Sequence, residues 1–162
     1  MAEEPEDRED LERPPSFFPS ELTGDAPSGD DLVEVRIDGV YQVEHNGQTS
    51  TYVCLTDGDR RLPIQIGPFE ALAIGMPLDG KRADRPMSHD LLRNIIERLG
   101  ATIDRIAIDD LWNQVFYAKL FLRRGDDEMV IDARPSDAIA LAIRFEAPMY
   151  VRQSILESSG EF

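Results

Sequence analysis

Residues 131–142 read IDARPSDAIALA, and this stretch predicts a strand that runs directly into a helix. Pro135 keeps Arg134 out of the helical backbone region, so we expect the helix to begin at about Ser136. A helix N-terminus favours a side-chain acceptor and a negative charge, which Ser136 and Asp137 provide. The junction is therefore either a well-capped helix start or a functional site.

Parts of this pattern occur elsewhere in the chain. Residues 85–90 read RPMSHD and again open an apolar-periodic stretch with Arg-Pro, Ser and Asp. A shift of 67 positions, with no gap, aligns further residues: Gly58 with Gly125, Ile64 with Ile131, Pro68 with Pro135 and Glu70 with Asp137. We therefore predict an internal duplication of strand-strand-strand-helix units.

The order of the expected elements indicates the fold class. Hydrophobic periodicity and turn residues predict strands at about 33–44, 49–55, 62–66, 103–111, 115–123, 129–133 and 148–151. Helices are expected at about 68–76, 88–99 and 136–145, with a last helical turn after 151. Triplets of strands joined by hairpins, with helices between them, favour an α+β fold with a largely antiparallel or mixed sheet and helices packed on it.

Two of these segments carry clear apolar patterns. The first strand alternates apolar with polar residues, which predicts that one face is buried: Val33, Val35, Ile37, Tyr41 and Val43. The helix that Ser88 begins and Gly100 ends places its apolar side chains on one face: Leu91, Leu92, Ile95, Ile96 and Leu99. We expect both faces to pack on the core.

Composition divides the 162 residues into an arm and one folded domain. Residues 1–30 hold ten acids against two arginines, together with five of the 11 prolines, and we expect a disordered acidic arm. Residues 31–162 form the second unit, which is long enough to bury a core. The net charge is −15, and the single cysteine excludes an internal disulfide. No apolar run is long enough for a membrane span, so we expect a cytoplasmic protein that does not bind a membrane.

Three motifs in order resemble one known family. They are LPIQIG at 62–67 with Glu70-Ala71, RPMSHDLL at 85–92 and IDARPSDA at 131–138. Together they are similar to the bifunctional nuclease domain, also known as DUF151, over roughly residues 32–156. That family is described as cleaving both RNA and DNA, so the resemblance implies a nuclease that hydrolyses phosphodiester bonds.

The chemistry of such a reaction suggests roles for the motif residues. Phosphodiester hydrolysis needs an activated water, neutralised phosphoryl oxygens and a protonated leaving oxygen. The candidate catalytic residues are His89, Asp90, Asp132 and Asp137. The candidate substrate-binding residues are Arg82, Arg85, Arg134 and Ser136. The candidate ligands of a divalent ion, Mg²⁺ or Mn²⁺, are Asp132, Asp137 and Glu70.

Each of these roles has a structural alternative. A His at a helix start often caps or packs, Asp137 and Glu70 can serve only as first-turn acids, and Arg134 can pair with Asp132 or Asp90 to join the two repeats. The competing function is a non-enzymatic domain that binds a ligand or partner, with structural Arg-Pro-Ser-Asp junctions. A nuclease should bring the charged groups together in an open cleft, whereas a scaffold should bury them in mutual pairs.

The net charge and the edges of the sheet indicate what this protein can bind. A net charge of −15 repels a polyanion, so nucleic acid needs a local basic patch, for which Lys81, Arg82 and Arg85 lie in one loop. A sheet domain must also cover its edge strands, and pairing with another copy is one solution. We therefore expect a nucleic-acid substrate and a homo-oligomer.

The acidic arm yields the first prediction. Deletion of residues 1–30 should leave the melting temperature nearly unchanged, because this segment contains too little apolar surface to pack on the domain. Calorimetry of the full and shortened chains measures the difference. A fall of more than about 5 °C, the scale of roughly 1 kcal/mol in a small domain, would contradict the prediction.

Overall fold

The computed structural model describes residues 31–159, so the expected arm lies outside the described residues. This range contains seven strands and four helices. The strands are β1 (Leu32–His45), β2 (Gln48–Thr56), β3 (Arg61–Ile66), β4 (Thr102–Trp112), β5 (Val115–Arg124), β6 (Asp127–Ala133) and β7 (Met149–Arg152). The helices are α1 (Pro68–Leu78), α2 (Ser88–Arg98), α3 (Pro135–Phe145) and α4 (Gln153–Ser159). None of the helices in this range is long and apolar enough to cross a membrane.

The strands form one mixed sheet in the order β3-β2-β1-β7-β4-β5-β6. Hairpins make β1-β2-β3 and β4-β5-β6 antiparallel. The short strand β7 joins these two halves, because it pairs antiparallel with β1 and parallel with β4. The α+β class and the largely antiparallel sheet are confirmed.

Both halves place three strands before a proline-started helix, as the sequence pattern predicts. Pro68 and Pro135 are the first residues of α1 and α3. Glu70 and Asp137 are the third residues of those helices, so the shift by 67 positions aligns equivalent places. The internal duplication itself stays a prediction.

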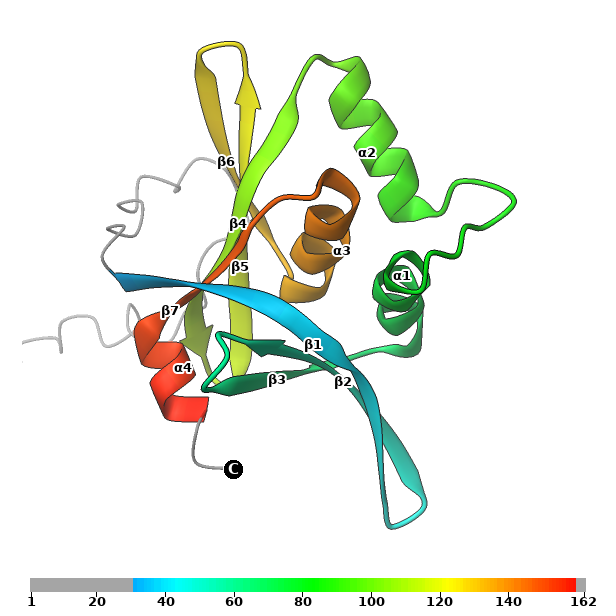
Figure 1. Cartoon of the computed structure of the whole chain (residues 1–162), viewed down its shortest axis with the longest axis vertical. Helices are drawn as coiled ribbons and strands as arrows, with labels where there is room; N and C mark the ends of the chain where they lie inside the picture. The colour runs from blue at the N-terminus through cyan, green and yellow to red at the C-terminus, as the bar shows by residue number, and fades with distance from the viewer. Residues whose placement is uncertain (1–30, 160–162) are drawn as a thin grey trace, which may run out of the picture.

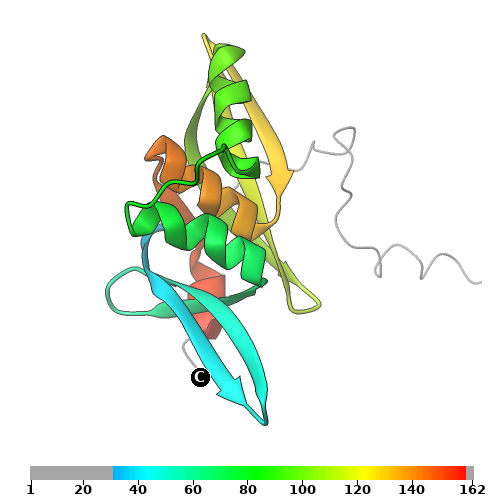
Figure 2. The ribbon, with the colours of Figure 1, turned by 90° about the vertical axis from the view of Figure 1, so that its right-hand side faces the viewer.

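One hydrophobic core lies between the sheet and the helices. Figures 1 and 2 show α1, α2 and α3 together on one side, whereas α4 packs separately against β3 and β7. The edge strand β3 alternates strictly, with Leu62, Ile64 and Ile66 buried and the residues between them exposed. The helix α3 is the most buried helix, since alanines at positions 138, 140 and 142 let it approach the sheet closely.

Two expectations about buried faces are wrong in part. A register shift between Ile37 and Gly39 interrupts the ladder of β1, and beyond it Tyr41 and Val43 are 48% and 52% exposed. The outer half of the β1-β2 hairpin projects from the body (Figure 1) instead of covering the core. The apolar face of α2 is also mostly uncovered, and only Ile96 of that face packs against the core cluster.

The helix starts differ from the expected caps by one or two residues. Arg134 occupies the cap position of α3, and Ser136 is the second helical residue, so it does not cap the helix. Met87 occupies the cap position of α2, where the Asp90 carboxylate accepts a hydrogen bond from the Met87 backbone N–H at 2.9 Å. Each of α1, α2 and α3 has an acid at its third position, where the helix dipole favours negative charge.

Arg144 connects the three clustered helices. Its side chain is only 6% exposed and leaves the last turn of α3. Its Nε donates to Asp90 Oδ1 on α2 at 2.8 Å, and its Nη1 donates to the backbone oxygens of Ala73 on α1 and Ala140 at 2.8 and 2.9 Å. A buried guanidinium therefore satisfies acceptors on every helix of the cluster.

Replacing Arg144 with lysine should destabilise the fold. An ammonium cannot reach three acceptors arranged around a planar fork, so we expect the free energy of unfolding to fall by about 1.5–3 kcal/mol. The matched control is Arg93→Lys, because the Arg93–Glu97 pair is about half exposed on both sides. Urea unfolding should show less than about 0.5 kcal/mol for the control, and equal losses in the two variants would refute the role of Arg144.

Candidate active site

The site is a chain of charged groups on the first turns of α1, α2 and α3. Arg134 Nε and Nη2 donate to Oδ2 and Oδ1 of Asp137 at 2.7 and 3.0 Å, a two-point contact. Its Nη1 donates to Glu70 Oε1 at 3.0 Å. One guanidinium thus joins the two acids that the sequence shift aligns. Its side chain is nevertheless 63% exposed, so solvent or a ligand can reach it.

His89 extends this chain from α2. Its Nε2 lies 2.9 Å from Asp137 Oδ1, and its side chain is 12% exposed. Burial alone would raise the pKa of Asp137, but hydrogen bonds from Arg134 and His89 outweigh it and hold the pKa below its ordinary value. Hydrogen bonds to Asp137 in turn raise the pKa of Arg134. The ionised Asp137 carboxylate is therefore in contact with both Arg134 and His89.

Asp90 follows His89 in sequence but belongs to a different contact. It pairs with Arg144 rather than with Arg134. Burial opposes its ionisation, yet hydrogen bonds from Arg144 and the Met87 N–H keep its pKa lowered. The predicted structural pair of Arg134 with Asp90 or Asp132 is absent among the described residues. The arginine that holds Asp90 is one that motif reasoning missed.

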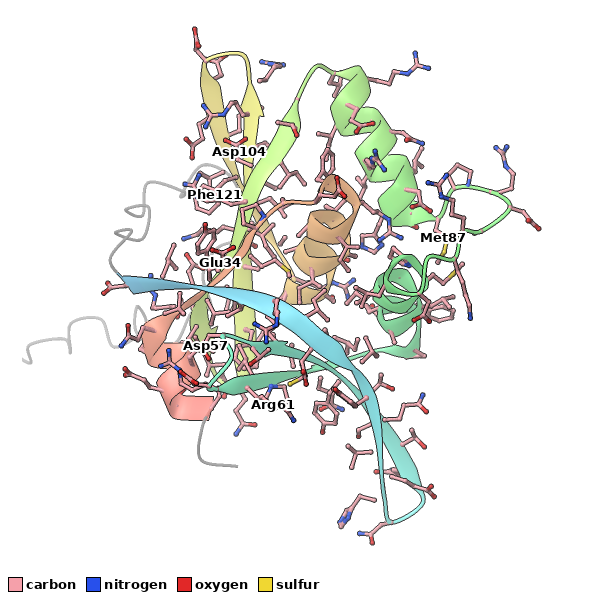
Figure 3. The ribbon with its side chains drawn as sticks, viewed as in Figure 1. Glu34, Asp57, Arg61, Met87, Asp104 and Phe121 are labelled. Atoms are coloured by element: carbon pink, nitrogen blue, oxygen red, sulfur yellow. The ribbon has the colours of Figure 1, made fainter. Side chains whose placement is uncertain are left out.

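Asp132 lies on the opposite face of the sheet from this site. It stands directly across from Lys119 on β5, whereas the next residue, Ala133, joins the core beneath the helices. Figure 3 shows Phe121, two residues after Lys119, on the side of the sheet away from α2 and α3. Lys119 pairs there with buried Asp109 at 2.6 Å. Burial and the nearby Asp109 raise the pKa of Asp132. The structure therefore does not bring Asp132 together with Asp137.

Of the remaining predicted residues, all but Arg85 line one of two hollows beside the charged chain. A pocket of about 350 Å³ lies between the end of β3, the starts of α1 and α3, and the β4-β5 turn, where Arg134, Ser136 and Glu70 contribute to its wall. A larger groove of about 770 Å³ lies between the 80–87 loop, α2 and the end of α3. Arg82 lines this groove together with Lys81, whereas Arg85 is exposed on the same loop. Figure 3 labels Met87 where this loop enters α2, beside α1.

Three groups were not identified from the sequence. Arg144 is seven residues after Asp137, and that helical spacing is the signal that could have indicated a shared face. Gln65 and Gln114 line the smaller pocket. Asn113 and Gln114 both adopt positive φ values, 48° and 62°, in a turn that contains no glycine. Asparagine tolerates this conformation, so Asn113 is a local signal for the turn, whereas Gln114 is not.

The proposed metal ligands do not form one ligand set. Asp132 faces the other side of the sheet, and the Arg134 guanidinium occupies the position between Glu70 and Asp137. Across residues 31–159, no three His, Cys, Asp or Glu side chains are grouped so that they could hold a metal ion.

The arrangement has features of both predicted alternatives. The charged groups are paired with one another, as in a scaffold, and His89 is mostly covered. They also meet beside an open pocket, and Arg134 is the most exposed of the four charged groups. A mixed arrangement of this kind fits a binding site whose polar groups are held in place before a ligand arrives.

Comparison with known proteins identifies the class. The family model described as the bifunctional nuclease domain matches residues 53–162, and this chain belongs to that family. An uncharacterized protein of Mycobacterium tuberculosis (strain ATCC 25618 / H37Rv) is 38% identical over 127 residues, covering 78% of this chain and 76% of that protein. Bifunctional nuclease 1 of Oryza sativa subsp. indica is 29% identical over 110 residues, which cover 65% of this chain but 33% of the rice protein. Bifunctional nuclease 2 of Arabidopsis thaliana is 22% identical over 102 residues, 61% of this chain and 31% of that protein.

The lowered pKa of Asp137 gives a pH prediction. A depressed carboxyl pKa contributes stability above the unfolded value of about 3.9, and this contribution disappears as the pH falls through the folded value. Asp137→Asn imitates the protonated acid, so its unfolding free energy should be about 1–2 kcal/mol below the parent at pH 7. The difference should shrink as the pH falls below about 4. A difference that is the same at pH 7 and pH 2.5 in urea unfolding would contradict this account.

Proposed function

We propose that this protein hydrolyses phosphodiester bonds of RNA and DNA, with the His89–Asp137–Arg134–Glu70 chain as its centre. The observation that carries the proposal is the contact of His89 and Arg134 with the same carboxylate, beside a pocket that two helix N-termini line. Membership of the bifunctional nuclease domain family supports the same activity. The names of the plant relatives support it too, although they belong to proteins about three times the length of the matched region.

His89 is the general base or acid in this proposal. Because Asp137 is held ionised, it can only accept, so in the form of His89 that acts as a base the proton lies on Nε2. The lone pair of the ring is then on Nδ1, which can take a proton from an attacking water or hydroxyl. Asp137 orients the ring and stabilises the cation that forms, so it is a positioning residue for His89.

Arg134 is the phosphate-binding group in this proposal. Its guanidinium forms a two-point contact with a carboxylate, and the same fork matches two phosphoryl oxygens. Residues at the starts of α1 and α3 line the same pocket, and the N-terminus of a helix carries partial positive charge. A phosphate at this position would compete with Asp137 and Glu70 for Arg134. Phosphate binding would therefore weaken the hold of Arg134 on Asp137, the carboxylate that orients His89, unless Arg134 contacts the phosphate and Asp137 at the same time.

The groove along the 80–87 loop offers a path for the rest of the nucleic acid. It contains Lys81, Arg82 and Arg93, and Arg144 lies at its base. Three acids also line it, so its local charge is close to neutral whereas the chain has a net charge of −15. Binding should accordingly involve few phosphates and depend modestly on salt.

The pairing of the same groups favours a second candidate, a non-enzymatic binding domain. His89 is 12% exposed and all four members of the charged chain have protein partners. In that case an anionic ligand or partner would bind Arg134 without reaction. The two functions differ in whether His89 is needed for turnover.

The test is cleavage of fluorogenic RNA and DNA by highly purified protein with Mg²⁺, Mn²⁺ or EDTA. We expect His89→Gln to lower kcat by at least about 100-fold, because a positioned general acid or base typically contributes that much. Asp137→Ala should abolish cleavage, and Arg134→Lys should weaken it because a point charge cannot replace the fork. The metal and EDTA arms measure whether turnover requires the divalent ion expected from the sequence.

Asp132→Asn is the matched control, since Asp132 is an acid of the same motif on the other face of the sheet. It should cleave at the rate of the parent. Thermal melts of all variants separate loss of activity from loss of fold. Parent-like cleavage by His89→Gln and Asp137→Ala would indicate a contaminating nuclease or a site elsewhere, and binding without cleavage would support the second candidate.

A further inference from the structure

The apolar stripe of α2 is the least explained surface of the described chain. It comprises Leu91, Leu92, Ile95 and Leu99, which are 53%, 42%, 46% and 67% exposed. No residue of α2 is buried, although its sequence is strongly amphipathic. An amphipathic helix normally gains its stability by burying the apolar face. Here that face points largely away from the core, which covers only the Ile96 flank.

The size of the stripe is that of a protein interface. Four leucine-sized side chains that are about half exposed present on the order of 400 Å² of apolar surface, which on a soluble protein usually marks a binding surface. A standard interface takes roughly 800 Å² from each partner, and somewhat more than half of it is apolar. The stripe therefore supplies most of the apolar share that a stable dimer needs from one chain.

The stripe is also complementary to itself. Ile95 is at the middle of the stripe, with Leu91 one turn before it and Leu99, the C-terminal cap residue of α2, one turn after it. Two antiparallel copies related by a two-fold axis through Ile95 would place Leu91 of each chain opposite Leu99 of the other. This orientation also sets the two helix dipoles antiparallel.

We propose that α2 is the core of a two-fold dimer interface, and that the occupant of the stripe is a second copy of this chain. The two α2 helices pack antiparallel across Ile95, and the interface covers Leu91, Leu92 and Leu99. The projecting β1-β2 hairpin, with its exposed Tyr41 and Val43, lies outside this interface. The inference does not depend on catalysis, because it concerns the outer face of α2 and not the His89 contact.

Light scattering coupled to size-exclusion chromatography tests the interface. The full chain should have twice the 18.3 kDa mass of one chain at micromolar concentrations. Ile95→Glu should return the mass of one chain with an unchanged circular dichroism spectrum, since the residue is already partly exposed. Val43→Glu is the control, because it places the same charge on an equally exposed apolar residue of the hairpin, and it should remain a dimer.

A cysteine pair tests the two-fold geometry. Ile95→Cys should form a disulfide-linked dimer on a non-reducing gel, whereas Arg93→Cys, on the other side of α2, should not. The parent is a further control because its single cysteine, Cys54, is buried. The proposal is overturned if the full chain has the mass of a monomer up to 100 µM, or if Val43→Glu dissociates the dimer and Ile95→Glu does not. A monomer that dimerises only after removal of residues 1–30 also overturns it and assigns the stripe to that arm.

Discussion

The two arginines of α3 are the constraint on which the helical layer depends. The helix itself is buried by its alanines, and its ends carry Arg134 and Arg144. Arg144 holds α2 through the Asp90 carboxylate and α1 through the backbone oxygen of Ala73, and Arg134 holds α1 through Glu70. No residue of α2 is buried, so these polar contacts stabilise its position, whereas most helices are held mainly by apolar packing. Removing one partner leaves a charge without its counterpart, which costs more than the pair contributes.

The same contacts define the candidate site, so stability and function share groups. Asp137 accepts from both Arg134 and His89, and it is therefore more than the surface first-turn acid that its sequence position suggests. Its replacement should cost more stability than the roughly 0.3–1 kcal/mol of a helix-dipole interaction alone. A domain with an ordinary 5–15 kcal/mol of stability tolerates such a loss and remains folded. A variant of Asp137 should thus lose activity while it stays folded, although its stability also falls.

Two arginines of this acidic protein lie where the helices meet. The net charge is −15, yet Arg134 and Arg144 lie beside the pocket and the groove that flank the charged chain. A guanidinium holds carboxylates in the free protein and can exchange them for phosphate, because both present two oxygens to a planar fork. The other charged cluster, with Asp109, Lys119 and Asp132, is separated from this one by the sheet. Sheet topology thus assigns acids of one motif, IDARPSD, to opposite faces.

The sequence by itself determined the order of elements, the proline-started helices and the residues of the motif, since hydrophobic period and backbone restrictions of proline are local properties. It also indicated Glu70, His89, Arg134 and Asp137 as candidates. Tertiary structure decided which of them meet. The packing of α2 against α3 brings Asp90 to Arg144. Asp132 lies on the other face of the sheet, because alternation along a strand sends neighbouring residues to opposite faces. The exposed stripe of α2 and the outer half of β1 had the patterns of buried faces. Whether such a face is covered depends on what the rest of the chain places beside it, and no local pattern encodes that.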